Sequence, residues 1–131
     1  MRRVRVLVCL VLALGALAPE VASAWSSNAF TSPTRNIRCR YVPSGGYLTC
    51  SSAALGRSVT LYFDGTTSRS WRVLPRRGPV LAYGESWDSV DGNGDLLHHC
   101  ESAVTGVYCY VNTDQGYGWF HISRSGIRTG H

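Results

Sequence analysis

Apolar and polar residues alternate with a period of two along most of the chain, from Ile37 to Ser123. Successive side chains of a β-strand point to opposite faces, so this period predicts strands rather than helices, whose period is 3.6. A single helical turn is expected only in the segment 51–57. The predicted strands are residues 37–42, 47–52, 59–63, 71–74, 80–87, 96–102, 107–112 and 118–123.

Clusters of glycine, proline, asparagine, aspartate and serine separate these strands, and 14 of the 131 residues are glycine. Short strands with regularly spaced turn residues are typical of antiparallel all-β domains. We therefore predict an all-β fold, either a small antiparallel sandwich or a barrel. Residues 25–131 are enough for one domain and too few for two.

The first 24 residues have the three parts of a secretory signal peptide. Three arginines occur among the first five residues, an apolar run spans 6–17, and residues 22–24 form a small-residue cleavage site. The apolar run is short, because a membrane-spanning helix needs about 20 residues. We predict cleavage after Ala24, export from the cell, and a mature chain of residues 25–131 without a transmembrane anchor.

Four cysteines remain after this cleavage, in two close pairs. Disulfides persist in an oxidising exterior, and four cysteines allow three connectivities, among which spacing alone does not choose. Hairpin turns at 43–46 and 104–105 would place the members of each pair directly opposite one another, within the distance that a disulfide spans. The favoured disulfides are therefore Cys39–Cys50 and Cys100–Cys109. Both hairpins contain a glycine in the turn and a tyrosine before the second cysteine, which suggests either a duplication or convergence.

The charge of the predicted mature chain is modest. Three of the 13 basic residues, all arginines, and one of the eight acidic residues lie in 1–24, which leaves ten arginines, seven acidic residues and a net charge of +3. We therefore interpret the arginines at 69, 72, 76 and 77, around Trp71, as a solvated strand and turn, and expect no nucleic-acid partner.

The chain has no recognisable catalytic or metal-binding motif. It contains no nucleophile elbow, phosphate-binding loop or histidine–glutamate zinc signature, and neither cysteine pair has the spacing of a zinc knuckle. The loop with Asp88, Asp91, Asn93 and Asp95 lacks the glycine and glutamate that a helix–loop–helix calcium site requires. We expect no metal and no cofactor.

Four segments carry a resemblance to a known family. They are 30–39 (Phe-Thr-Ser-Pro-Thr-Arg-Asn-Ile-Arg-Cys), 81–84 (Leu-Ala-Tyr-Gly), the hairpin 100–109, and 118–124 (Gly-Trp-Phe-His-Ile-Ser-Arg). With these segments the chain resembles a family of small exported actinobacterial proteins of unknown function. The resemblance implies export, paired disulfides and a β fold. It implies no catalytic residues.

The candidate site follows from how the last three predicted strands share a face. If 107–112 turns back through 113–116 into 118–123, burial of Phe120 and Ile122 forces Trp119 and His121 outward. The outward face then carries two rows of side chains: His99, Tyr110 and Trp119, and Glu101, Tyr108 and His121.

We interpret these six residues as a binding surface, because tyrosine and tryptophan combine flat apolar area with a hydrogen-bonding edge. Alternatively, the aromatic pairs only stabilise the sheet, or another part of a sandwich covers them. The predicted function is a secreted, non-enzymatic protein that binds an extracellular protein or an envelope component. The alternatives are a small secreted hydrolase or nuclease that uses His99, Glu101 and His121, and a structural envelope protein. His98 is expected to point inward and to have hydrogen-bond partners in the core.

Overall fold

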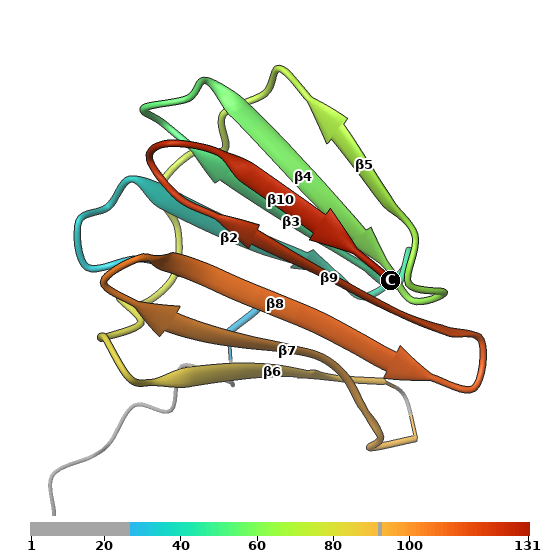
Figure 1. Cartoon of the computed structure of the whole chain (residues 1–131). Coiled ribbons are helices and arrows are strands. Elements are labelled where there is room, and N and C mark those ends of the chain that lie inside the picture. The colour runs from blue at the N-terminus through green and yellow to red at the C-terminus, as the bar shows by residue number, and fades with distance from the viewer. Residues whose placement is uncertain (1–26, 92) are drawn as a thin grey trace, which may run out of the picture.

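The computed structural model describes residues 27–91 and 93–131, which form two packed antiparallel β-sheets (Figure 1). The predicted signal peptide, residues 1–24, lies outside the described residues. Within the described ranges there is no helix, and hence none long and apolar enough to cross a membrane. The strands are β1 (Ala29–Thr31), β2 (Ile37–Val42), β3 (Tyr47–Ser52), β4 (Arg57–Tyr62), β5 (Thr67–Ser70), β6 (Ser86–Val90), β7 (Leu96–Ala103), β8 (Gly106–Thr113), β9 (Gly116–Ile122) and β10 (Ile127–Gly130).

Each sheet is a meander of five strands that are consecutive in sequence. The first sheet has the order β1-β2-β3-β4-β5, and the second has the order β10-β9-β8-β7-β6. The all-β prediction is confirmed, and of its two forms the sandwich is the observed one. Short hairpin connections of this kind need no crossover, because neighbouring antiparallel strands are joined directly by turns.

Both predicted disulfides are present and occupy equivalent places. Cys39–Cys50 joins the second and third strands of the first sheet, and Cys100–Cys109 joins the second and third strands of the second sheet. In each sheet an aromatic residue of the preceding strand lies opposite the first cysteine, Phe30 beside Cys39 and Trp87 beside Cys100. The two sheets therefore repeat one plan, and the repeat extends beyond the two hairpins that resemble each other in sequence.

The core lies between the sheets and is built from the inward-pointing half of each alternating strand. Phe30 and Trp87 meet across it with ring centroids 5.3 Å apart, and the Trp87 indole donates a hydrogen bond to the Ser27 carbonyl at 2.8 Å. Phe120 and Ile122 are fully buried, as predicted. Burial of such side chains is the main stabilising term, at about 25 cal/mol per Å² of apolar surface.

The β4–β5 turn packs directly against β9. The Thr113 hydroxyl donates to the Phe63 carbonyl at 2.8 Å, and a Cβ atom added to Gly118 would lie 1.9 Å from the Gly65 carbonyl oxygen. Gly65 itself has a φ of 86°, a conformation that other residues rarely adopt. Glycine on both sides thus allows the two backbones to touch, and this contact fixes the start of the strand that carries Trp119 and His121.

The prediction of strands at 71–74 and 80–87 was largely wrong. The segment around Leu74 instead crosses the outside of the first sheet, where the Leu74 amide donates to the Ser51 hydroxyl at 2.9 Å and Arg38 donates to the Leu74 carbonyl at 3.0 Å. The chain then reaches the β1 edge, and Leu81 is buried in the core. Val80 forms only an isolated parallel bridge with Thr31. A turn at 82–85 follows, with Gly84 at a φ of 84°, so β6 begins only at Ser86.

Three short strands, β1, β5 and β10, were not predicted. The expected single helical turn at 51–57 is present as one turn, in which the Gly56 amide donates to the Ser52 carbonyl at 2.9 Å. β5 reads Thr-Ser-Arg-Ser and is almost entirely exposed, so it has no alternation of apolar and polar residues to detect. Residues 53–56 form a turn between β3 and β4. β5 is therefore defined by its backbone pairing with β4 rather than by burial of its side chains.

Candidate binding surface on the second sheet

The outward face of the second sheet carries all six predicted site residues. The strand registers place His99 opposite Tyr110 and Tyr110 opposite Trp119, and the neighbouring row runs Glu101, Tyr108, His121. Both predicted rows are therefore observed, and each extends by one strand at either end. The first row continues to Asp88 in β6 and Gly130 in β10, and the second continues to Ser86 and Arg128.

Three aromatic rings form a continuous strip at the middle of this face, which we call the aromatic strip: Tyr110, Tyr108 and Trp119. Ring centroids are 6.0 Å apart for Tyr108 and Tyr110, and 5.9 Å apart for Tyr108 and Trp119. All three side chains are half-buried, so each keeps part of its surface in contact with solvent. No strand of the first sheet covers them, because the first sheet packs on the opposite face.

The Trp119 indole packs against the neighbouring edge strand, β10. A Cβ atom on Gly130 would stand 2.5 Å from the indole nitrogen, so the ring occupies the space above this glycine. The lack of a side chain in β10 at this point allows the indole to lean onto the backbone. One edge of the aromatic strip is thereby fixed in place.

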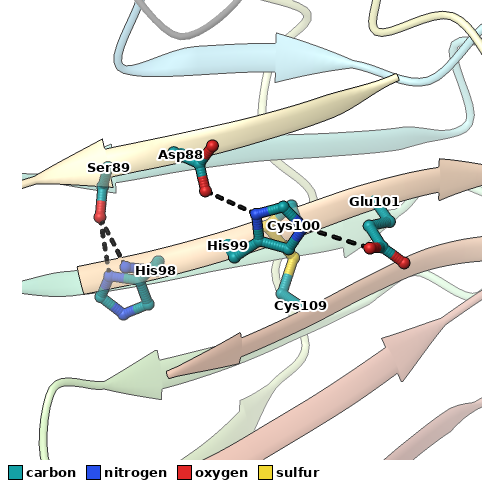
Figure 2. A network of polar contacts seen from close by, with 7 residues as sticks. All are labelled: Asp88, Ser89, His98, His99, Cys100, Glu101 and Cys109. Carbon is teal, nitrogen blue, oxygen red and sulfur yellow. Dashed lines mark hydrogen bonds and ion pairs between the residues drawn. A yellow bond between two sulfur atoms is a disulfide. The ribbon is translucent and has the colours of Figure 1, made fainter. Parts of the chain in front are cut away.

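At the other edge, His99 is held between two carboxylates, as Figure 2 shows. Its Nδ1 lies 2.5 Å from Asp88 Oδ1, and its Nε2 lies 3.2 Å from Glu101 Oε1. Burial alone would lower the pKa of His99, but the hydrogen bonds and charges of Asp88 and Glu101 outweigh it and raise that pKa above its ordinary value. A carboxylate can only accept, so both ring nitrogens act as donors and the imidazolium form is favoured.

Glu101 and His121 are not brought together. Tyr108 stands between them in the row, as predicted from the register. Burial lowers the pKa of His121, and the nearby Arg128 lowers it further. Burial, followed by the Tyr117 hydroxyl, raises the pKa of Tyr108 to about 12. Both side chains therefore remain uncharged near neutral pH.

Sequence reasoning missed three residues that complete the surface: Asp88, Tyr117 and Arg128. The alternation predicts a strand that ends at residue 87 and so leaves Asp88 in a loop, whereas β6 spans Ser86–Val90. Arg128 lies on β10, which has too short a pattern to be predicted. Asp88 and Arg128 could have been found by extending each predicted row to the next strand on either side.

His98, next to His99 in sequence, points into the core and belongs to a different network (Figure 2). Its Nε2 donates to the Leu61 carbonyl at 3.0 Å, because a carbonyl only accepts. The Ser89 hydroxyl accepts from the His98 amide at 2.9 Å and donates to Nδ1 at 3.2 Å. The expectation of an inward histidine with satisfied partners is confirmed. Burial lowers the pKa of His98 to about 4.

The other charged segments form no comparable site. Arg57 lies 3.9 Å above the ring of Trp71, which is 77% exposed. In the loop before β7, Asp91 Oδ1 accepts hydrogen bonds from the Asn93 and Asp95 amides and thus shapes the loop itself. Within 27–91 and 93–131, no group of three or more His, Cys, Asp or Glu side chains could hold a metal ion.

Comparison with known proteins identifies no relative: no family model, no curated protein and no solved structure matches the chain. The resemblance to small exported actinobacterial proteins stays a prediction. The functional argument therefore rests on the geometry of the second sheet.

Proposed function

We propose that this protein is exported and acts without catalysis, by binding an extracellular protein or an envelope component through the outward face of its second sheet. One observation carries the proposal. Tyr110, Tyr108 and Trp119 form a continuous, half-exposed aromatic strip on adjacent strands. Rigid aromatic side chains supply large contact areas at low entropic cost, and such residues dominate binding energies at interfaces.

The sheet beneath the strip is unusually well fixed, which supports this function. Cys100 and Cys109 lie on the inward face of β7 and β8. Their register position falls between the row that contains His99 and Tyr110 and the row that contains Glu101 and Tyr108. The hairpin that presents Tyr108 and Tyr110 is thus covalently closed. A preorganised surface loses less conformational entropy when a ligand binds.

Charges of opposite sign flank the strip and would orient a ligand. Asp88 and Glu101 lie at the β6–β7 side, where one histidine partly compensates them, and Arg128 lies at the β10 side. Polar groups at the rim of an aromatic surface contribute specificity more than affinity.

The alternative of a small hydrolase or nuclease has less support. Both ring nitrogens of His99 donate to carboxylates, so this side chain has no free nitrogen with which to accept a proton. His121 and Glu101 are separated by Tyr108. The groups on this face are therefore better suited to recognition than to proton transfer.

The test is a comparison of Trp119→Ala, Trp71→Ala and Phe120→Ala. The binding partners to be tested are the insoluble envelope fraction and the exported proteins of the producing cells, with the bound fraction measured by co-sedimentation and by capture on immobilised protein. Trp119→Ala is expected to lose at least about tenfold in affinity, since anchor residues contribute about 2 kcal/mol or more. Trp71→Ala is the matched control, because its tryptophan is exposed but lies outside the strip.

Thermal unfolding of the same variants separates binding from folding. Phe120→Ala should lose about 3–5 kcal/mol of stability, because Phe120 is fully buried. Trp119→Ala should lose only about 1 kcal/mol, the contribution of an aromatic pair at a surface. If Trp119→Ala unfolds as readily as Phe120→Ala, or binds as well as Trp71→Ala, the aromatic strip is not a recognition surface.

A further inference from the structure

A pocket of about 660 Å³ lies at one end of the sandwich, next to the aromatic strip. Its walls come from the β1–β2, β7–β8 and β9–β10 turns together with Tyr83. In Figure 1 the β7–β8 and β9–β10 turns stand at the left end of the molecule. The volume is within the range of ordinary small-molecule sites, roughly 300–1,000 Å³.

The charge of this pocket is one-sided. Arg124 and Arg128 line it, no aspartate or glutamate does, and both arginines are exposed. Among the residues that the structure describes, neither arginine takes part in an ion pair. Two guanidinium groups without carboxylate partners are available to bind an anionic ligand, because each planar guanidinium can donate two parallel hydrogen bonds to carboxylate or phosphate oxygens.

The rest of the lining is rich in hydroxyl groups. It includes Ser32, Thr34, Tyr83, Thr105, Ser123 and Ser125. Some of these form turns, as when Ser123 and Ser125 bond each other at 3.1 Å, but a hydroxyl can both donate and accept and so retains capacity for a ligand. Such a lining suits a ligand that itself carries several hydroxyl groups.

A second hollow at the opposite end of the sandwich has a different character. It measures about 320 Å³ and is lined by apolar residues such as Phe63 and Leu97 together with Asp91 and Asp114. The combination of arginines with hydroxyl groups therefore distinguishes the larger pocket from the hollow at the opposite end of the sandwich.

The larger pocket is continuous with the aromatic strip. His121 and Arg128 line the pocket and also end the outward row that contains Tyr108. His121 stands between Tyr108 of β8 and Arg128 of β10, and Glu101 lies beyond Tyr108 in the same row. A ligand long enough to fill the pocket could therefore extend onto the flat rings of Tyr108 and Trp119.

We propose that this pocket binds an acidic saccharide residue, with its carboxylate or phosphate on Arg124 and Arg128, and that the sugar chain continues over Trp119 and Tyr108. The inference rests on the proposed function in one respect, since the aromatic strip serves here as the platform for the following sugars. Flat sugar faces pack on aromatic rings, while the hydroxyl-rich pocket exchanges hydrogen bonds with the terminal residue.

The experiment is an NMR titration of the folded, oxidised chain of residues 25–131. The probes are a neutral glucose oligosaccharide, the same oligosaccharide oxidised to glucuronate, glucose 6-phosphate, and inorganic phosphate and acetate alone. Arg124→Gln/Arg128→Gln is compared with Arg76→Gln/Arg77→Gln, a control that removes the same charge from two exposed arginines outside the pocket.

The oxidised oligosaccharide should shift resonances of the pocket and bind at least about tenfold more tightly than its neutral counterpart, a difference typical of charge-assisted hydrogen bonds. Arg124→Gln/Arg128→Gln should abolish this preference, and the Arg76/Arg77 control should retain it. The pKa of His121 should rise on binding, because the anion offsets the charge of Arg128.

Phosphate and acetate alone should bind more weakly than the acidic saccharides, since they make no contact through sugar hydroxyls. Equal binding of the free ions would indicate a simple anion site and overturn the saccharide assignment.

The proposal is also overturned if no acidic probe is preferred over the neutral one at millimolar concentration, or if both arginine pairs have the same effect. Trp119→Ala separates the two proposals. This substitution should weaken the binding of the oxidised oligosaccharide and leave the binding of glucose 6-phosphate unchanged. If Trp119→Ala weakens the binding of neither ligand, while Arg124→Gln/Arg128→Gln weakens the binding of both, the pocket is a binding site and the aromatic strip is not a binding surface.

Discussion

The Nε2 atom of His98 in β7 donates a hydrogen bond to the carbonyl of Leu61 in β4, at 3.0 Å, and so joins the two sheets through the core. Only the neutral imidazole suits this position, because Nδ1 accepts from Ser89 while Nε2 donates. Protonation would place a charge in the core and leave Ser89 facing a donor. The sandwich therefore depends on a histidine that stays neutral.

His98 is expected to make the protein sensitive to acid. The pKa of His98 is about 4 in the folded protein, against 6.5 for an ordinary histidine such as that of the unfolded chain. The unfolded chain therefore binds the proton more tightly. The stability that His98 contributes is complete above pH 6.5 and is lost as the pH falls towards 4. Between pH 7.5 and 4.5 the loss should be about 2–3 kcal/mol.

Urea unfolding of the wild type and of His98→Gln at these two pH values measures this effect. The variant should be less stable at pH 7.5 but should lose less stability on acidification. His99 acts in the opposite direction, because its pKa is raised, and it is present in both proteins. Equal acid losses in the two proteins would show that His98 does not control the response.

Two buried serines should respond oppositely to replacement by alanine. Ser89 exchanges two hydrogen bonds with His98, so Ser89→Ala should cost about 1–3 kcal/mol by leaving that histidine unsatisfied. The Ser102 hydroxyl is buried and has no hydrogen-bond partner among the described residues. Ser102→Ala should therefore be neutral or stabilising by up to about 1 kcal/mol. Chemical denaturation of both variants gives the comparison, and a large loss for Ser102→Ala would show that this hydroxyl has a partner.

Asp88→Asn should lower the pKa of His99. The carboxylate supplies both a hydrogen bond and a charge that favour the imidazolium, whereas burial opposes it. NMR titration of the His99 ring protons measures the change, with Asp114→Asn as a control on an exposed turn away from His99. The same His99 pKa in both variants would contradict the assigned contact.

The predicted processing can be checked on exported protein. Its intact mass should equal residues 25–131 less four hydrogens, and peptide mapping should join Cys39 to Cys50 and Cys100 to Cys109. Free thiols in non-reduced material or crossed linkages would contradict the disulfides, and a retained N-terminal segment would contradict cleavage after Ala24.

Short-range patterns predicted the parts of this molecule that depend on neighbouring strands. The hairpin that places Cys39 opposite Cys50, and the outward position of Trp119, follow from alternation and from the turn between two adjacent strands. The same reasoning predicted both rows of the candidate site, since each register depends only on a turn of a few residues. Strands β5 and β10 were missed because they are short, lie at edges and bury little. β1 is buried at Phe30 and Thr31, but its three residues are too few to show an alternation.

Relationships between distant segments were decided only by the tertiary structure. Leu61 and His98 are 37 residues apart, and the pocket brings Thr34 together with Arg124 and Arg128 across the two sheets. No local period encodes such contacts, because they depend on which faces of the two sheets pack together and at what offset. The sequence by itself determined the β2–β3 and β7–β8–β9 registers and the six residues of the two predicted outward rows. The packing of one sheet on the other determined the neutral state of His98 and the pocket that adjoins the aromatic strip.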